Sequence, residues 1–140
     1  MKIAKEFRWE MGHRLPKHEG ACRNLHGHSY RMVVEVEGDV NPGTGMVIDF
    51  ADISTIVKPF LLELDHAFLC QEDDREVRDL LENMDLKRVY IPVPSTVENI
   101  CGLFVDRLRP AFDACKEVKA FTVRIWETAS SVAEIRAELR

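Results

Sequence analysis

Apolar and polar residues alternate over two stretches near the start of the chain, residues 2–13 and residues 26–38. Every second residue belongs to the more apolar set: Phe7, Trp9, Met11 and His13 in the first stretch, and His26, His28, Tyr30, Met32, Val34 and Val36 in the second. This period of two predicts two half-buried strands, and Pro16 and Gly20 indicate a loop between them. Antiparallel pairing would place the end of the first strand beside the start of the second.

The middle of the chain shows the spacing of helices instead. Asp49 is the expected N-cap of the first helix, and Pro59 is expected to kink it. Ser95 and Glu98 fit a capping box at the start of the last helix. The three helices are predicted over residues 50–64, over residues 75–84, and from this capping box to about Leu108.

Alternation returns over residues 118–127, a last strand is predicted over residues 132–139, and residues 87–91 could form a further short strand. This order of elements predicts an α+β fold: an antiparallel four-stranded sheet with helices packed on one face and a polar opposite face. The length of 140 residues fits a single domain over residues 1–140.

Composition narrows the class of protein. The net charge of −5 and the absence of a basic stripe argue against a nucleic-acid partner. No secretory signal and no membrane-spanning apolar run is recognised, so no membrane partner is expected. The four cysteines form no C-x-x-C pair, which favours free thiols in a reducing cytoplasmic location.

Three histidines share one face at the adjoining strand ends: His13, His26 and His28. A lone histidine on an apolar face is more often a core residue, but three together favour a metal site. Three imidazoles leave open the fourth position that catalytic zinc needs. The alternative is a closed structural site in which Cys22 is the fourth ligand. It is less favoured, because a core of this size needs no metal for stability.

Cys22 and the Asp65-His66 pair are candidates for proton transfer. Cys22 lies in a polar loop beside Arg23, a cation that favours a thiolate; the alternative is a small buried apolar side chain. Asp65 and His66 follow the first predicted helix. They form either a simple helix stop or an aspartate that orients a proton-shuttling histidine.

Glu127 ends the most apolar strand face in the second half of the chain. A buried carboxylate without a partner is costly, and Arg124 has the opposite parity. A ligand with an amidine-like or guanidine-like edge would provide two parallel N–H donors for it. Glu98 is explained by the capping box, with a minor substrate role left open. The remaining candidates for metal or thiol chemistry are assigned to packing, surface or solvent: Cys70, Cys101, Cys115 and His18.

Six segments resemble the family of 6-pyruvoyltetrahydropterin synthases and 6-carboxytetrahydropterin synthases. They run in family order over nearly the whole chain: His13-Arg-Leu-Pro16, Cys22 with His26-Gly-His28, Gly45-Met-Val-Ile-Asp-Phe50, Leu64-Asp-His66, Ser95-Thr-Val-Glu-Asn99 and Glu127-Thr128. The resemblance implies the tunnelling fold, in which the sheets of several protomers join edge to edge into a barrel. It also implies a homohexamer with active sites between subunits.

The same resemblance implies a role for each candidate residue. Zinc would be the cofactor and a pterin the small-molecule substrate. The implied assignments are His13, His26 and His28 as zinc ligands, Cys22 as the proton acceptor, Asp65 and His66 as a relay that can serve a neighbour's zinc, Glu127 as the pterin anchor, and Thr96 and Glu98 as further substrate contacts.

The short Cys22–His26 segment favours the carboxy branch of the family. The expected reaction converts 7,8-dihydroneopterin triphosphate to 6-carboxy-5,6,7,8-tetrahydropterin, a queuosine precursor, and releases acetaldehyde and triphosphate. The alternatives are a 6-pyruvoyltetrahydropterin synthase and, from another class, a non-catalytic zinc-stabilised binding domain. The chain departs from the family pattern at Cys70, at Ile135 and in its longer 71–92 connection.

Overall fold

The computed structural model describes residues 1–140 and contains a six-stranded sheet in the order β4-β3-β1-β2-β5-β6. Its strands are β1 (Lys2–His13), β2 (His26–Gly38), β3 (Ala67–Gln71), β4 (Arg88–Ile91), β5 (Val118–Thr128) and β6 (Ser131–Glu138). Its helices are α1 (Phe50–Leu64), α2 (Arg75–Asn83) and α3 (Val97–Asp113), and a short 3₁₀ turn, η1, covers Ala21–Arg23.

The antiparallel pairing predicted for the first two strands is confirmed. β1 and β2 pair along their whole length, and His13 lies directly opposite His26. β5 continues the sheet on the other side of β2, and β6 pairs with β5, both antiparallel. The three strands predicted from alternation and the last strand predicted over residues 132–139 therefore all lie in the sheet, close to their expected boundaries.

The prediction of a purely antiparallel four-stranded sheet is wrong, because β3 and β4 extend it beyond β1. β3 pairs parallel with β1, and β4 pairs parallel with β3, which makes the sheet mixed. The sequence of β3, Ala67-Phe-Leu-Cys-Gln71, is a short apolar run without alternation. Such a run has no distinctive period. A short strand was considered over residues 87–91, and its pairing with β3 places β4 in the sheet.

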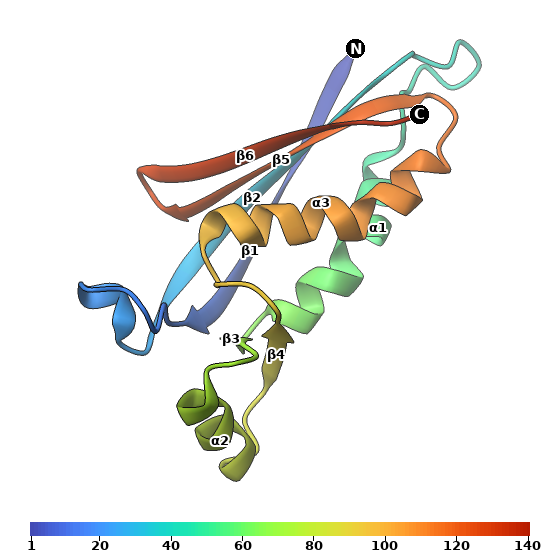
Figure 1. Cartoon of the computed structure of the whole chain (residues 1–140). Helices are drawn as coiled ribbons and strands as arrows, with labels where there is room; N and C mark the ends of the chain where they lie inside the picture. Colours follow the sequence, from blue (N-terminus) through green and yellow to red (C-terminus); the bar gives the residue numbers. More distant parts are fainter.

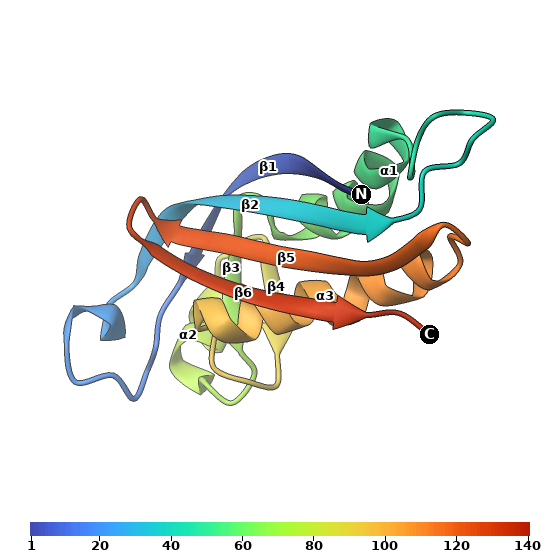
Figure 2. The same ribbon diagram turned by 90° about the horizontal axis from the view of Figure 1, so that it is seen from above.

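The helices α1 and α3 cover one face of the sheet, and the opposite face is left open (Figures 1 and 2). Trp9 of β1 packs on Phe104 of α3, with ring centroids 5.4 Å apart, and Phe104 packs on Phe60 of α1 at 4.8 Å. These residues belong to a core of 27 buried side chains. No helix combines the length and the apolar character that crossing a membrane requires.

Two details of the last helix differ from the prediction. It ends at Asp113 rather than near Leu108 and continues through Pro110, because Phe112 packs fully buried against Phe121 of β5. Burying such a ring contributes about 1.5–3 kcal/mol, comparable to the cost of a proline in the helix interior. The N-cap is Thr96, whose hydroxyl accepts from the Asn99 N–H at 3.3 Å. The N-cap is therefore displaced by one residue from Ser95, and the expected capping box does not form, because the Asn99 side chain donates to the Pro94 carbonyl at 2.9 Å.

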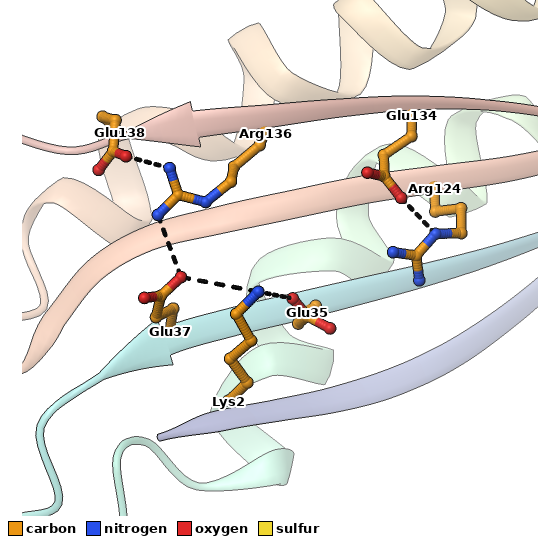
Figure 3. Close-up of polar contacts among 7 residues, drawn as sticks. All are labelled: Lys2, Glu35, Glu37, Arg124, Glu134, Arg136 and Glu138. Carbon is orange, nitrogen blue, oxygen red and sulfur yellow. Dashed lines mark hydrogen bonds and ion pairs between the residues drawn. The ribbon is translucent and has the colours of Figure 1, made fainter.

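The open face is polar and charged, as predicted. Ion pairs cross β1, β2, β5 and β6 there (Figure 3): Lys2 contacts Glu35 at 3.0 Å, Arg136 contacts Glu37 at 3.0 Å and also Glu138, and Arg124 contacts Glu134. Exposed ion pairs of this kind each contribute only about 0–1 kcal/mol. These ion pairs therefore indicate which face of the sheet is not covered by helices, and they add little to the free energy of unfolding.

Candidate active site

Three imidazoles converge at the end of the β1–β2 pair, on the face that the helices cover. The nearest ring nitrogens of His13, His26 and His28 all lie within 4.8 Å of one another. Their ring centroids are 4.6–5.1 Å apart. The convergence follows from strand geometry, since His26 and His28 are two residues apart on β2 and His13 is the partner of His26.

Backbone carbonyls fix which nitrogens face the centre of the cluster. The Nδ1–H of His13 donates to the Ser95 carbonyl at 2.7 Å, and the Nδ1–H of His26 donates to the Asn24 carbonyl at 2.7 Å. A carbonyl oxygen can only accept, so each neutral ring keeps its lone pair on Nε2. Metal-binding histidines commonly have such an outer partner.

The Nε2 atoms of all three histidines are buried and have no hydrogen-bond partner within the protein. Three buried ring nitrogens without partners at one point are expensive unless a ligand satisfies them. Burial also lowers the pKa of His13 to about 4 and lowers the pKa of His28, so both rings are neutral near pH 7. The cluster therefore fits a metal ion that prefers nitrogen ligands.

Glu127 lies at the edge of this cluster. Its Oε1 is 3.7 Å from Nε2 of His28, and its side chain is 21% exposed. It ends the apolar face of β5 at a point where the pairing with β6 changes register. Beside it, Tyr30 is buried with an unpartnered hydroxyl, and burial followed by the charge of Glu127 raises the pKa of that hydroxyl. Glu127 is therefore close to the triad, and it is only partly buried where the sequence predicted a buried carboxylate.

Cys22 is half-buried within η1, in the loop that joins β1 to β2. Its carbonyl accepts from the Leu15 N–H at 2.8 Å, which ties the two ends of the loop together. The thiol is not a member of the ligand cluster. This arrangement favours the three-histidine site over the closed site with Cys22 as a fourth ligand.

The Asp65–His66 pair follows α1 and does not belong to the three-histidine cluster. Asp65 Oδ1 is 3.0 Å from Nδ1 of His66, and the His66 side chain is 75% exposed. His66 lines a hollow of about 330 Å³ together with Glu10, Ser29 and His28, so this hollow adjoins one member of the triad. The hydrogen bond from the Glu10 N–H is the main cause that lowers the pKa of Asp65.

The remaining cysteines, His18 and Glu98 do not belong to the three-histidine cluster. Burial raises the pKa of both the Cys70 and the Cys101 thiol to about 11 and also raises that of Cys115, which favours the protonated thiol at all three positions. The ring of His18 accepts a hydrogen bond from Gly20 within the exposed loop. Glu98 is exposed on the first turn of α3.

Sequence reasoning missed the residues that hold the site in place. Ser95 was interpreted as a helix cap, yet it is fully buried and its carbonyl orients His13. Arg14 makes a bidentate ion pair with Asp74, with contacts of 2.7 and 2.6 Å, and so ties the end of β1 to the start of α2. Every residue carries a backbone carbonyl, so no pattern of side chains indicates that the Ser95 carbonyl would orient His13. Arg14 and Asp74 are 60 residues apart in the sequence, so no local pattern predicts their ion pair.

Relatives of known sequence match nearly the whole chain. The 6-carboxy-5,6,7,8-tetrahydropterin synthase of Haemophilus influenzae is 36% identical over 140 residues, covering 95% of this chain and 96% of that protein. The enzyme of the same name from Aquifex aeolicus is 33% identical over 159 residues, covering 98% of each chain.

Solved structures and a family model also match nearly the whole chain. An uncharacterised protein from Wolinella succinogenes has a TM-score of 0.83 at 26% identity, with 99% of this chain and 98% of that chain covered. The 6-pyruvoyl tetrahydropterin synthase of Plasmodium falciparum has a TM-score of 0.75 at 17% identity with the same coverage, a likeness of fold. The family model described as 6-pyruvoyl tetrahydropterin synthase matches residues 2–138. The chain therefore belongs to the 6-pyruvoyl tetrahydropterin synthase family.

Proposed function

We propose that the protein converts 7,8-dihydroneopterin triphosphate and water to 6-carboxy-5,6,7,8-tetrahydropterin, acetaldehyde and triphosphate, and so acts as a lyase that makes a queuosine precursor. The observation that carries this proposal is the match to two relatives named for that product, at 36% and 33% identity over nearly their full length. The short segment between Cys22 and His26 supports the same branch, since its length sets where the thiol lies relative to the histidines.

The metal of this reaction is proposed to be zinc, held by Nε2 of His13, His26 and His28. The support is the set of buried, unpartnered nitrogens in a site with no fourth protein ligand. When bound, zinc would supply Lewis acidity that makes the hydroxyl and C–H groups of the substrate side chain easier to deprotonate.

Protons would be moved by two side chains, those of Cys22 and His66. The Cys22 thiolate would accept a proton from the substrate side chain. His66, oriented by the carboxylate of Asp65 at 3.0 Å, would carry protons to or from the same region. The exposure of His66 suits this role, because the imidazole can meet a substrate that another surface presents.

Substrate recognition is assigned to Glu127. Its carboxylate would accept two parallel N–H bonds from the 2-amino group and the ring N–H of the pterin. The position of Glu127 at the edge of the triad would place the pterin beside the metal. Thr96 and Glu98, at the start of α3, would make minor contacts.

The working form is proposed to be a homohexamer with active sites shared between subunits. Two features support this arrangement: β4 and β6 are open sheet edges, and the His66 side chain is 75% exposed. An exposed imidazole at the surface could also face the active site of a neighbouring protomer. All four cysteines are free thiols, in keeping with a proposed cytoplasmic location.

A product assay tests the proposal. The zinc-loaded protein is incubated anaerobically with dihydroneopterin triphosphate, the aldehyde is trapped, and the pterin is identified by mass. We expect acetaldehyde in a one-to-one ratio with 6-carboxytetrahydropterin. Accumulation of 6-pyruvoyltetrahydropterin without acetaldehyde would assign the pyruvoyl reaction instead. A protein that binds zinc and pterin but consumes no substrate would be a binding domain.

A further inference from the structure

The turn that carries Asp65 and His66 has a strained backbone. His66 has a φ angle of 59°, a left-handed conformation that residues with a side chain rarely adopt. Such a conformation persists only where the surroundings hold it. Glu10 of β1 provides two anchors: its N–H donates to Asp65 Oδ1 at 2.9 Å, and its carbonyl accepts from the His66 N–H at 2.7 Å.

Lys87 provides further anchors on both sides of the same turn. Its ammonium group donates to the carbonyls of Leu62 at 2.8 Å and Asp65 at 2.6 Å. Its own carbonyl accepts from the Phe68 N–H at 3.0 Å. α1 has no basic residue in its last turn, so Lys87 supplies the cation that the carbonyl end of a helix favours.

The segment that carries Lys87 is firmly docked. Lys87 lies in the 71–92 connection, immediately before β4, and β4 pairs with β3 starting at Arg88 and Phe68. At its other end the connection is tied to β1 by the ion pair between Asp74 and Arg14, two side chains that are only 5% and 18% exposed. The ammonium group is therefore presented from a fixed support rather than from a free loop.

We propose that Lys87 is a positioning residue, whose ammonium group fixes the turn that presents the Asp65 carboxylate and the His66 imidazole for proton transfer. This inference rests on the role proposed above for that pair. Both contacts of the ammonium group are to backbone carbonyls, so Lys87 acts through the turn. Its charge also contributes, after the Glu10 N–H and His66, to the lowered pKa of Asp65.

The test compares Lys87→Met, which keeps length but removes charge and donors, with Lys87→Arg, which keeps both. Lys119→Met is the matched control, because Lys119 is an exposed lysine with a single contact, to Asp39 at 2.7 Å. We expect Lys87→Met to lower kcat about 10-fold, with KM, zinc content and melting temperature close to wild type. This loss is smaller than the about 10²–10⁴-fold that removal of a general acid or base costs. Hydrogen exchange of the His66 amide should become faster, and Lys87→Arg should restore most of both properties.

A double-mutant cycle with His66→Ala separates this inference from the function it rests on. If Lys87 acts only through the turn, adding Lys87→Met to His66→Ala lowers kcat no further. A full additional loss in the double variant, or wild-type kcat in Lys87→Met while His66→Ala is impaired, would overturn the inference alone. Full substrate consumption by His66→Ala would instead refute the proposed role of the pair, and the positioning role with it.

Discussion

The histidine triad and the Asp65–His66 pair are built in opposite ways. The triad lies under the helices, with His13 only 1% exposed, and it is assembled by one hairpin-like strand pair in perfect register. The Asp65–His66 pair lies at the end of α1, with the His66 side chain 75% exposed. Its conformation depends on contacts from β1 and from the 71–92 connection.

This difference matches the chemistry proposed for each part. Burial keeps the imidazoles of His13 and His28 neutral and their lone pairs free of water, which suits metal binding. An open position suits His66, because a proton carrier must meet a substrate. Changes in the triad should therefore remove the metal, whereas changes in the pair should leave it bound.

The largest effect is expected from His28→Ala, which should abolish zinc binding. Two imidazoles remain, too few for a stable site of this kind. The strand pairing does not depend on this side chain, so the fold should persist in circular dichroism. His18→Ala, in the exposed loop, is the control and should keep all its zinc by elemental analysis. Full zinc content in His28→Ala, or a carefully prepared wild type that binds none, would show that the triad is not a zinc site.

Cys22→Ala should keep the fold and the metal but lose turnover by about 10²–10⁴-fold, the usual contribution of a general acid or base. Zinc content, melting temperature and activity are measured on one preparation. Cys115→Ala is the control and should remain active. Joint loss of zinc and thermal stability in Cys22→Ala would support the alternative of a closed structural site in which Cys22 is the fourth ligand. Unchanged activity would rule out both roles.

Glu127→Ala should weaken pterin binding by about 10–10²-fold, as expected for hydrogen bonds to a charged group worth about 1.5–3 kcal/mol. Stability of the empty protein should be unchanged or higher, because the carboxylate is held for a ligand. Titration calorimetry with a dihydropterin measures the affinity, and Glu127→Gln is the matched variant. A destabilised protein with intact affinity would mean that Glu127 serves as an ion-pair partner of His28.

The smallest effect is expected from Ser95→Ala. This change removes a hydroxyl 3.2 Å from Nδ1 of His13 but keeps the carbonyl that accepts its N–H at 2.7 Å. Loss of an outer partner of a metal ligand typically costs about 10–100-fold in metal affinity, so retention of the carbonyl should limit the loss to less than about 10-fold. Competition with a chelator measures it. A larger loss would show that the hydroxyl, rather than the carbonyl, orients the ring.

Several parts of the fold and site could be predicted because a local pattern determines them. The parity of two alternating strands placed His13 with His26 and His28, since register moves a side chain to one face or the other. The helix over Phe50–Leu64 was predicted with its Asp49 cap, whose carboxylate accepts from the Ala51 N–H at 2.7 Å. Both signals act within a few residues.

The sequence by itself determined the alternating strands, the helix starts and the residue types of the metal site, because period and capping act locally. Only the tertiary structure decided that β3 joins β1 in parallel, that α3 continues to Asp113 against Phe121, and that His66 shares a hollow with Glu10 and Ser29. It also decided which carbonyls orient His13 and accept from Lys87. These hydrogen bonds to backbone carbonyls join segments that are distant in the sequence. Every residue carries a backbone carbonyl, so no pattern of side chains along the chain could predict them.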